Sequence, residues 1–154
     1  VISGERDAVE QLLGELEADE FFDATVIEPR IPMHAPCFVR TGERLGDVLA
    51  AVPFTTATGV YVPNTRAELV ASASPAHIRT CLVEHVSRPV RWRASVDAMA
   101  AHVPEPWFVE VGPRAVLHNL FGKGWMPGRR SKTDAPEGWP AHLDALAKEL
   151  RDAG

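Results

Sequence analysis

The chain has 154 residues, of which 45% are hydrophobic and 24% are charged, and this composition excludes a generally disordered protein. The formal net charge of −5 argues against a nucleic-acid-binding surface. No stretch approaches the ~20 apolar residues of a membrane span, and the first residues lack the basic and apolar segments of a signal peptide. We therefore expect a cytoplasmic globular protein that binds neither nucleic acid nor membrane.

The cysteines and the first residues indicate the context of the chain. Cys37 and Cys81 are the only cysteines, and their spacing is unlike that of metal ligands, so we expect two buried, reduced thiols. The chain has no initiator methionine and begins abruptly on the apolar pair Val1-Ile2. This start predicts a piece cut from a longer polypeptide.

The first third of the chain predicts a strand–helix–strand unit followed by a loop. Residues 1–3 resemble the end of a strand, and residues 22–28 are partly β-branched and alternate, which predicts a second strand. Between them, residues 5–18 have the spacing of one apolar helix face. That face consists of Val9, Leu12, Leu13 and Leu16. Residues 29–38 contain three prolines, which favour a loop over a regular element.

The middle of the chain predicts two helices around a strand. Residues 40–52 are expected to form a helix, and residues 55–62 a strand that Pro63-Asn64 ends. Ser74 is a good N-cap and Pro75 a good first helical residue, so a helix should begin there and end before Pro89. One face of this helix would contain Ile78, Cys81, Leu82 and His85.

The last third continues the alternation. Residues 94–102 predict a helix, residues 107–111 a short strand, and Gly112-Pro113 a turn into a helix that includes Leu117 and Leu120. Residues 122–138 are expected to form a loop, and residues 139–150 a final helix. Strands alternating with helices predict an α/β fold with a largely parallel sheet. Sites in such sheets gather at the carboxyl ends of strands, which here are the loops after Ile27 and Val111.

His34 is the first candidate for chemistry. It lies in the loop Ile31-Pro32-Met33-His34-Ala35-Pro36, which would hold an imidazole in place at the end of a strand. Imidazole titrates near neutral pH and can act as a general base. The local sequence alone leaves open a loop histidine with no role. A serine nucleophile is missing beside it, because no serine of this chain lies in a Gly-x-Ser-x-Gly turn.

Several segments, in their order and spacing, resemble the C-terminal half of the malonyl/acyl-CoA:acyl carrier protein acyltransferases of fatty acid and polyketide synthases. The resemblance runs from Ser3-Gly4 to at least Leu120. The matching segments are Val1-Ile2-Ser3-Gly4 with Ala8-Val9-Glu10, the loop ending in His34, Val62-Pro63-Asn64-Thr65, Pro89-Val90-Arg91-Trp92, and residues 108–113 with Val116-Leu117.

The resemblance implies a division of the chain and a set of roles. Residues 1–28 would be the last part of a small ferredoxin-like subdomain, and residues 29–154 part of an α/β-hydrolase-like core. His34 would be the catalytic histidine, and the backbone carbonyl of His85 would hold its second ring nitrogen. For the side chain of His85, a core histidine satisfied by a backbone group is the alternative.

Two further residues are assigned to the substrate by the resemblance. Met33, just before the histidine, would fill the space of a 2-methyl branch and so favour malonyl over methylmalonyl, or it simply packs. The segment Val62-Pro63-Asn64-Thr65 takes the place of a strand end near the site in the family, and its Asn64 is assigned to substrate binding. The serine, the oxyanion hole and the arginine for the malonyl carboxylate belong to the half that this chain lacks.

The implied reaction is a ping-pong transfer. A serine from the N-terminal half of the same domain would take the malonyl group from coenzyme A and pass it to the phosphopantetheine thiol of an acyl carrier protein, with no permanently bound cofactor. The basic residues Lys123, Arg129, Arg130 and Lys132 would lie in one loop that could meet an acidic carrier protein, or would simply be solvated. Two alternatives stay open, namely a non-catalytic docking module for a carrier protein and a serine hydrolase of related fold.

Overall fold

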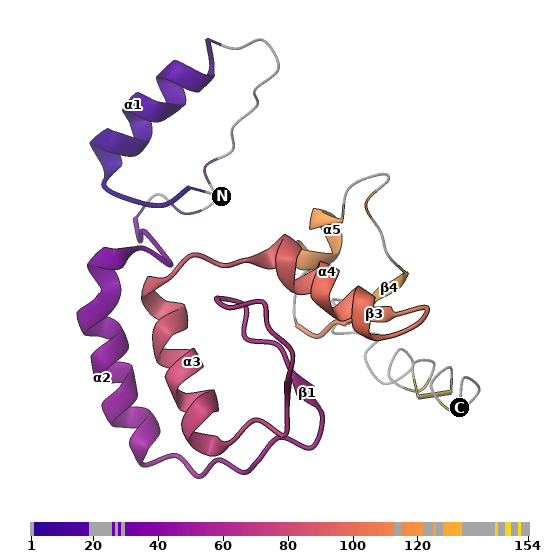
Figure 1. Cartoon of the computed structure of the whole chain (residues 1–154). Helices are drawn as coiled ribbons and strands as arrows, with labels where there is room; N and C mark the ends of the chain where they lie inside the picture. The colour runs from indigo at the N-terminus through magenta and orange to yellow at the C-terminus, as the bar shows by residue number, and fades with distance from the viewer. Residues whose placement is uncertain are drawn as a thin grey trace. The chain divides into compact units, whose positions relative to one another are not determined.

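Figure 1 shows the computed structural model of the chain, which describes residues 2–18, 26, 28, 30–112, 115–121, 125, 128–133, 144, 147–148 and 151. The chain divides into two compact units, Val1–Val96 and Asp97–Gly154. Residues 27 and 29, on either side of the boundary expected at residue 28, lie outside the described residues.

The first unit is built mainly of helices. Its elements are α1 (Arg6–Leu16), η1 (Pro36–Phe38), α2 (Val39–Ala50), β1 (Val60–Tyr61), β2 (Val70–Ala71) and α3 (Pro75–Ser87). The three α-helices agree with the predicted helices to within two or three residues at each end. In Figure 1, α2 and α3 run side by side, and η1 contacts both of them.

Glycines on α2 allow the close approach of α3. A Cβ added to Gly42 would lie 2.9 Å from the carbonyl oxygen of Val83, which is closer than real Cβ atoms come. One turn later, a Cβ at Gly46 would lie 3.4 Å from Cγ2 of the same valine. The backbone of α2 therefore packs directly against α3, the helix that carries His85.

Both ends of α3 follow the sequence signals. The Ser74 side chain accepts a hydrogen bond from the backbone N–H of His77 at 3.2 Å, and Pro75 is the first residue of the helix. At the other end, Arg88 is extended, as expected before Pro89. The prediction of a helix that begins and ends here is confirmed.

The two cysteines differ in burial, which corrects the expectation of two buried thiols. Cys81 on α3 is buried, and this burial raises the pKa of its thiol. Cys37 is exposed, because it lies in η1, which follows the His34 loop at the surface of the unit. Both thiols are free.

The strand expected over residues 55–62 is much shorter in the structure. Only Val60 and Tyr61 form β1, paired antiparallel with Ala71 and Val70 of β2. A strand needs a neighbour to take its backbone hydrogen bonds, and within the described residues β2 offers a partner for only these two. Residues 2 and 3, expected to end a strand, have no regular structure.

The second unit contains a small parallel sheet with a short helix. β3 (Trp107–Glu110) pairs parallel with β4 (Arg129–Lys132), and α5 (Val116–Leu120) contacts both strands. α4 (Trp92–His102) precedes them and begins two residues earlier than expected. The carboxylate of Glu110 accepts the backbone N–H groups of Leu117 and His118, so the end of β3 caps the start of α5.

The strand β4 was not predicted, because its sequence Arg-Arg-Ser-Lys has no apolar alternation. Side chains fix it instead. The indole N–H of Trp107 donates to Ser131 at 3.0 Å, and the guanidinium of Arg129 lies 5.0 Å from the centre of the Trp107 ring. Arg130 donates to the carbonyls of His118 and Phe121. The basic residues of this segment therefore lie in a strand rather than in the expected loop, although Arg129 and Arg130 are exposed to solvent.

Other predictions lie outside the described residues. Most of the strand expected over residues 22–28 is not described, and neither is most of the helix expected over residues 139–150, nor Lys123. Within the described residues, the parallel sheet is represented only by β3 and β4, while β1 and β2 are antiparallel. No helix in this part of the chain is long and apolar enough to cross a bilayer.

Candidate functional site

His34 lies in a tight loop just before η1. The backbone N–H of Met33 donates to the carbonyl of Ile31 at 2.8 Å, and Ala35 on the other side is buried. The φ angle of His34 is 61°, in the left-handed region that non-glycine residues seldom adopt. Such a conformation costs of order 1–3 kcal/mol and persists where the surroundings enforce it. The loop therefore presents the imidazole in one fixed direction.

A backbone carbonyl on α3 holds one nitrogen of this ring. Nδ1 of His34 lies 2.7 Å from the carbonyl oxygen of His85. A carbonyl can only accept, so Nδ1 carries the proton and donates it. The neutral imidazole then has its lone pair on Nε2, which has no hydrogen-bond partner among the described residues. This is the contact that the sequence resemblance implied, and it leaves Nε2 able to accept a proton.

The side chain of His85 also contacts His34. The two rings are stacked, with centroids 4.6 Å apart and planes inclined by 24°. Nε2 of His85 lies 2.9 Å from Nδ2 of Asn64. Burial, and then the charge of His34, lowers the pKa of His85 below its ordinary value of 6.5. The expectation of an inward-facing histidine agrees with this placement, although the group that meets the ring is a side-chain amide rather than the backbone.

Ion pairs and backbone contacts hold Asn64 and α3 together. The guanidinium of Arg66 binds both oxygens of Glu84 at 3.0 Å, and Arg88 lies 3.3 Å from the same carboxylate. The hydrogen bonds from Arg66 lower the pKa of Glu84. The backbone N–H of Arg91 donates to the carbonyl of Asn64 at 2.7 Å.

Sequence reasoning missed these supporting residues. Glu84 is the neighbour of His85 in the sequence, and Arg91 lies inside the Pro-Val-Arg-Trp segment, so position was the only signal that could have pointed to them. Their partners, Arg66 for Glu84 and Asn64 for Arg91, lie far away in the chain. Neither pairing leaves a signal in the sequence, and only the folded turn brings the partners together.

The structure brings three of the four predicted site residues together. His34, His85 and Asn64 form a cluster that is connected by hydrogen bonds and by ring stacking. Met33 precedes the cluster in the chain, and its residue surface is 51% exposed. Chemically, the cluster offers an imidazole whose Nε2 can accept a proton. Within the described residues, no group of histidine, cysteine and acidic side chains could hold a metal ion.

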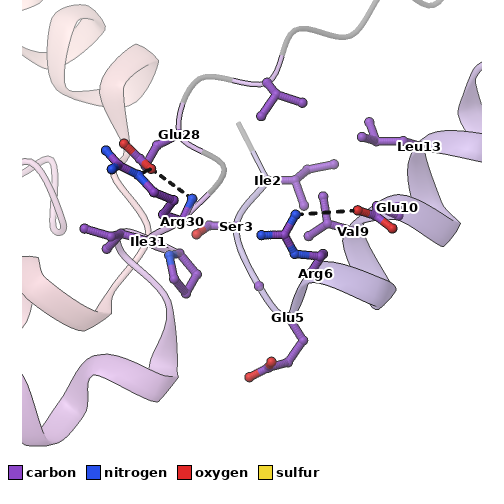
Figure 2. Close-up of a pocket in the computed structure, with 13 residues that line it drawn as sticks. Ile2, Ser3, Glu5, Arg6, Val9, Glu10, Leu13, Glu28, Arg30 and Ile31 are labelled. Carbon is purple, nitrogen blue, oxygen red and sulfur yellow. Dashed lines mark hydrogen bonds and ion pairs between the residues drawn. The ribbon is translucent and has the colours of Figure 1, made fainter.

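A separate pocket of about 340 Å³ lies between α1 and the segment before His34 (Figure 2). Four of its charged side chains form two pairs, Arg6 with Glu10 at 3.9 Å and Arg30 with Glu28 at 3.3 Å. Figure 2 shows both pairs among the lining residues, which also include apolar side chains such as Ile2 and Val9. The pocket contains no histidine or cysteine, so we place the candidate chemistry at His34 instead.

Sequence comparison relates the chain to malonyl CoA-acyl carrier protein transacylases. No protein-family model matches the chain. The malonyl CoA-acyl carrier protein transacylase of Salmonella typhimurium is 32% identical over 120 residues, which is 78% of this chain and 38% of that protein. The enzyme of the same name from Escherichia coli K12 is 31% identical over the same shares. The chain therefore spans less than half the length of the curated relatives that it matches.

Solved structures agree with this result. The malonyl-CoA:acyl carrier protein transacylase of Xanthomonas oryzae has a TM-score of 0.76 and 26% identity, over 92% of this chain and 44% of that chain. The acyl carrier protein S-malonyltransferase of Vibrio cholerae has a TM-score of 0.75 and 25% identity, over 93% and 44%. The fold is mixed α/β, and the chain resembles the C-terminal half of a malonyl-CoA:acyl carrier protein transacylase.

Proposed function

We propose, from this similarity to one half of the transacylases, that the protein takes part in moving a malonyl-type group from coenzyme A to an acyl carrier protein. This chain would supply the general base, His34. The observation that carries the proposal is the hydrogen bond from Nδ1 of His34 to the carbonyl of His85, at 2.7 Å. It fixes the tautomer in which Nε2 is the free acceptor, as a base that must deprotonate a hydroxyl requires.

The proposed first half-reaction transfers the acyl group to a serine. Nε2 of His34 takes the proton of a serine hydroxyl supplied by the N-terminal half, and the serine oxygen attacks the thioester carbonyl. Collapse of the tetrahedral intermediate breaks the C–S bond, and the coenzyme A thiolate leaves with the proton from His34. While His34 is protonated, its Nδ1–H bond to a carbonyl becomes charge-assisted and stronger.

The proposed second half-reaction reverses these roles. The phosphopantetheine thiol of the carrier protein gives its proton to His34, and its sulfur attacks the acyl–serine ester. The serine oxygen then leaves and regains a proton from His34. Neither half-reaction needs a permanently bound cofactor.

The remaining parts of the proposal concern the fold and the partners. Residues 29–154 would belong to an α/β-hydrolase-like core, and residues 1–28 to a ferredoxin-like subdomain. The partners would be the N-terminal half of the same domain, coenzyme A thioesters and an acyl carrier protein. One similar structure, with a TM-score of 0.75 and 22% identity, is a malonyl-transacylase in complex with a type II polyketide acyl carrier protein. That likeness supports the shared fold.

The test replaces the base in the full-length protein. Removal of a general base typically lowers the rate ~10²–10⁴-fold, and we expect this loss of malonyl transfer for His34→Asn. Asparagine tolerates the left-handed backbone of position 34 better than alanine does, so the fold should be kept, as a thermal melt can show. The matched control is His102→Asn, at an exposed position in the last turn of α4.

Two other outcomes would contradict different parts of the proposal. Parental transfer by a folded His34→Asn variant would contradict the assignment of the base. If the parent releases free malonate from malonyl-CoA at the same rate with and without a carrier protein, the acceptor is water and the protein is a hydrolase.

A further inference from the structure

The side chain of His85 does more than the proposed reaction requires of this position. That reaction uses only the backbone carbonyl, which any residue offers. In the structure, the same residue contacts His34 a second time, because its ring stacks on the imidazole with centroids 4.6 Å apart. The carbonyl fixes one edge of the His34 ring, and the stack limits rotation of the ring about that edge.

The ring of His85 is itself held in place. The amide nitrogen of Asn64 can only donate, so Nε2 of His85, 2.9 Å away, is the acceptor, and the proton of the neutral ring lies on Nδ1. The carbonyl of Asn64 is fixed in turn by the backbone N–H of Arg91 at 2.7 Å. The stack is therefore supported by a chain of contacts that ends on the backbone.

The charges around His85 favour a neutral ring. His34 is the ionisable group that faces it, and burial together with that charge lowers the pKa of His85. The nearest carboxylate in the sequence, Glu84, binds Arg66 and Arg88 instead. A neutral ring can stack on His34 while His34 is protonated, whereas a charged ring would oppose the imidazolium.

We propose that the side chain of His85 is a positioning residue, whose ring is held by Asn64 and orients the imidazole of His34 for proton transfer. The inference rests on the proposed function, since it assumes that His34 is the base. It also changes the expected role of Asn64, from contacting the substrate to fixing the ring of His85.

The test compares three variants in the full-length protein. His85→Ala keeps the carbonyl but removes the ring, and Asn64→Ala keeps the ring but removes its donor. The loss of a stacked pair of aromatic rings corresponds to about a three- to tenfold change in a rate or equilibrium constant. We therefore expect each variant to lower kcat by that factor. KM for malonyl-CoA should stay the same, because proton transfer belongs to the transition state. His85→Gln returns a planar amide with an acceptor oxygen and should restore kcat to within about twofold.

A double variant and a control sharpen the comparison. If Asn64 acts through His85, the double variant His85→Ala/Asn64→Ala should be no slower than the worse single variant, since the two share one interaction. The exposed His102→Ala should keep the parental kcat. A folded His85→Ala variant with parental kcat would overturn the inference while leaving His34 as the base. An inactive parent, or an active His34→Asn variant, would instead overturn the proposed function.

A second measurement holds even if His85→Ala does not fold. Long-range ¹⁵N–¹H spectra of the parent should show His85 protonated at Nδ1 and unprotonated at Nε2. In Asn64→Ala this preference should be lost. If Nε2 of His85 carries the proton in the parent, the proposed role of Asn64 as donor is wrong.

Discussion

Met33 lies next to His34, the proposed base, and the bulk of its side chain should influence which acyl group is accepted. A difference of one methylene-sized group changes selectivity by about 10–200-fold, so we expect the full-length protein to prefer malonyl over methylmalonyl within this range. Met33→Ser should narrow the preference. The measurement is a competition between the two coenzyme A thioesters, with the acyl-enzyme read by mass spectrometry. An equal mixture in the parent, or an unchanged ratio in Met33→Ser, would mean that selectivity is set in the other half of the domain.

The half-buried ring of His85 should make stability depend on pH. Its pKa lies below 6.5 in the folded state, because burial and the charge of His34 disfavour protonation, so the unfolded chain binds more protons. The contribution of the neutral His85 ring to the free energy of unfolding is fully present above about pH 6.5. This contribution is lost as the pH drops toward the lowered pKa of His85. In urea unfolding of the full-length protein at pH 8 and pH 5.5 (chosen to bracket the ordinary pKa), His85→Gln should lose less stability on acidification than the parent. An equal loss in both proteins would contradict the lowered pKa.

At the residue scale, the sequence was informative where the resemblance implied a contact. The contact between His34 and the carbonyl of His85 could be expected from the resemblance alone. The link from Asn64 to His85 could not, because it needs the turn after β1 to face α3, and that turn is held by Arg66 and Glu84. Long-range pairs of common residue types leave no periodic signal in a sequence.

The close packing of α2 on α3 gives a prediction at the level of helices. In Gly42→Ala the new Cβ would meet the carbonyl of Val83 at 2.9 Å. Overpacking costs typically 1–3 kcal/mol, which exceeds the ~1 kcal/mol gained from better helix propensity. We therefore expect a lower free energy of unfolding, measured in urea. The control is Gly14→Ala in α1, where a Cβ meets nothing within 4 Å and only the gain should remain. Equal stabilisation of both variants would show that α2 can move away from α3 without cost.

Helices were predicted better than strands, and the reason is physical. An amphipathic face or an N-cap such as Ser74 is local, so α1, α2, α3 and α4 could be placed from the sequence. A strand depends on a neighbour far away in the chain. Among residues 55–59, Ala57 donates a backbone hydrogen bond to Ala73, but strand pairing within the described residues begins only at Val60. β4 pairs with β3 although its polar sequence resembles a loop.

The part of the chain that the structure describes exposes many large apolar side chains. The buried hydrophobic residues there include Ala35, Ala73, Cys81, Val96 and Phe121, while Val111 is 77% and Val48 64% exposed. Burial of such side chains drives association. We expect the chain expressed alone to self-associate, and to form a defined complex with a separately expressed N-terminal half, as size-exclusion chromatography and intact mass can show. A stable monomer of 16.8 kDa with a cooperative melt would contradict this expectation.

The bond that fixes His34 joins two segments 51 positions apart, yet both belong to this one chain. If His34 is the base, as proposed, its orientation is set within this chain before any nucleophile arrives. If the two halves are made separately, we expect complementation to need only docking, without a slow ordering step on this side. Acyl transfer should then rise with the concentration of the other half along a simple saturation curve, and its midpoint should equal the dissociation constant of the halves.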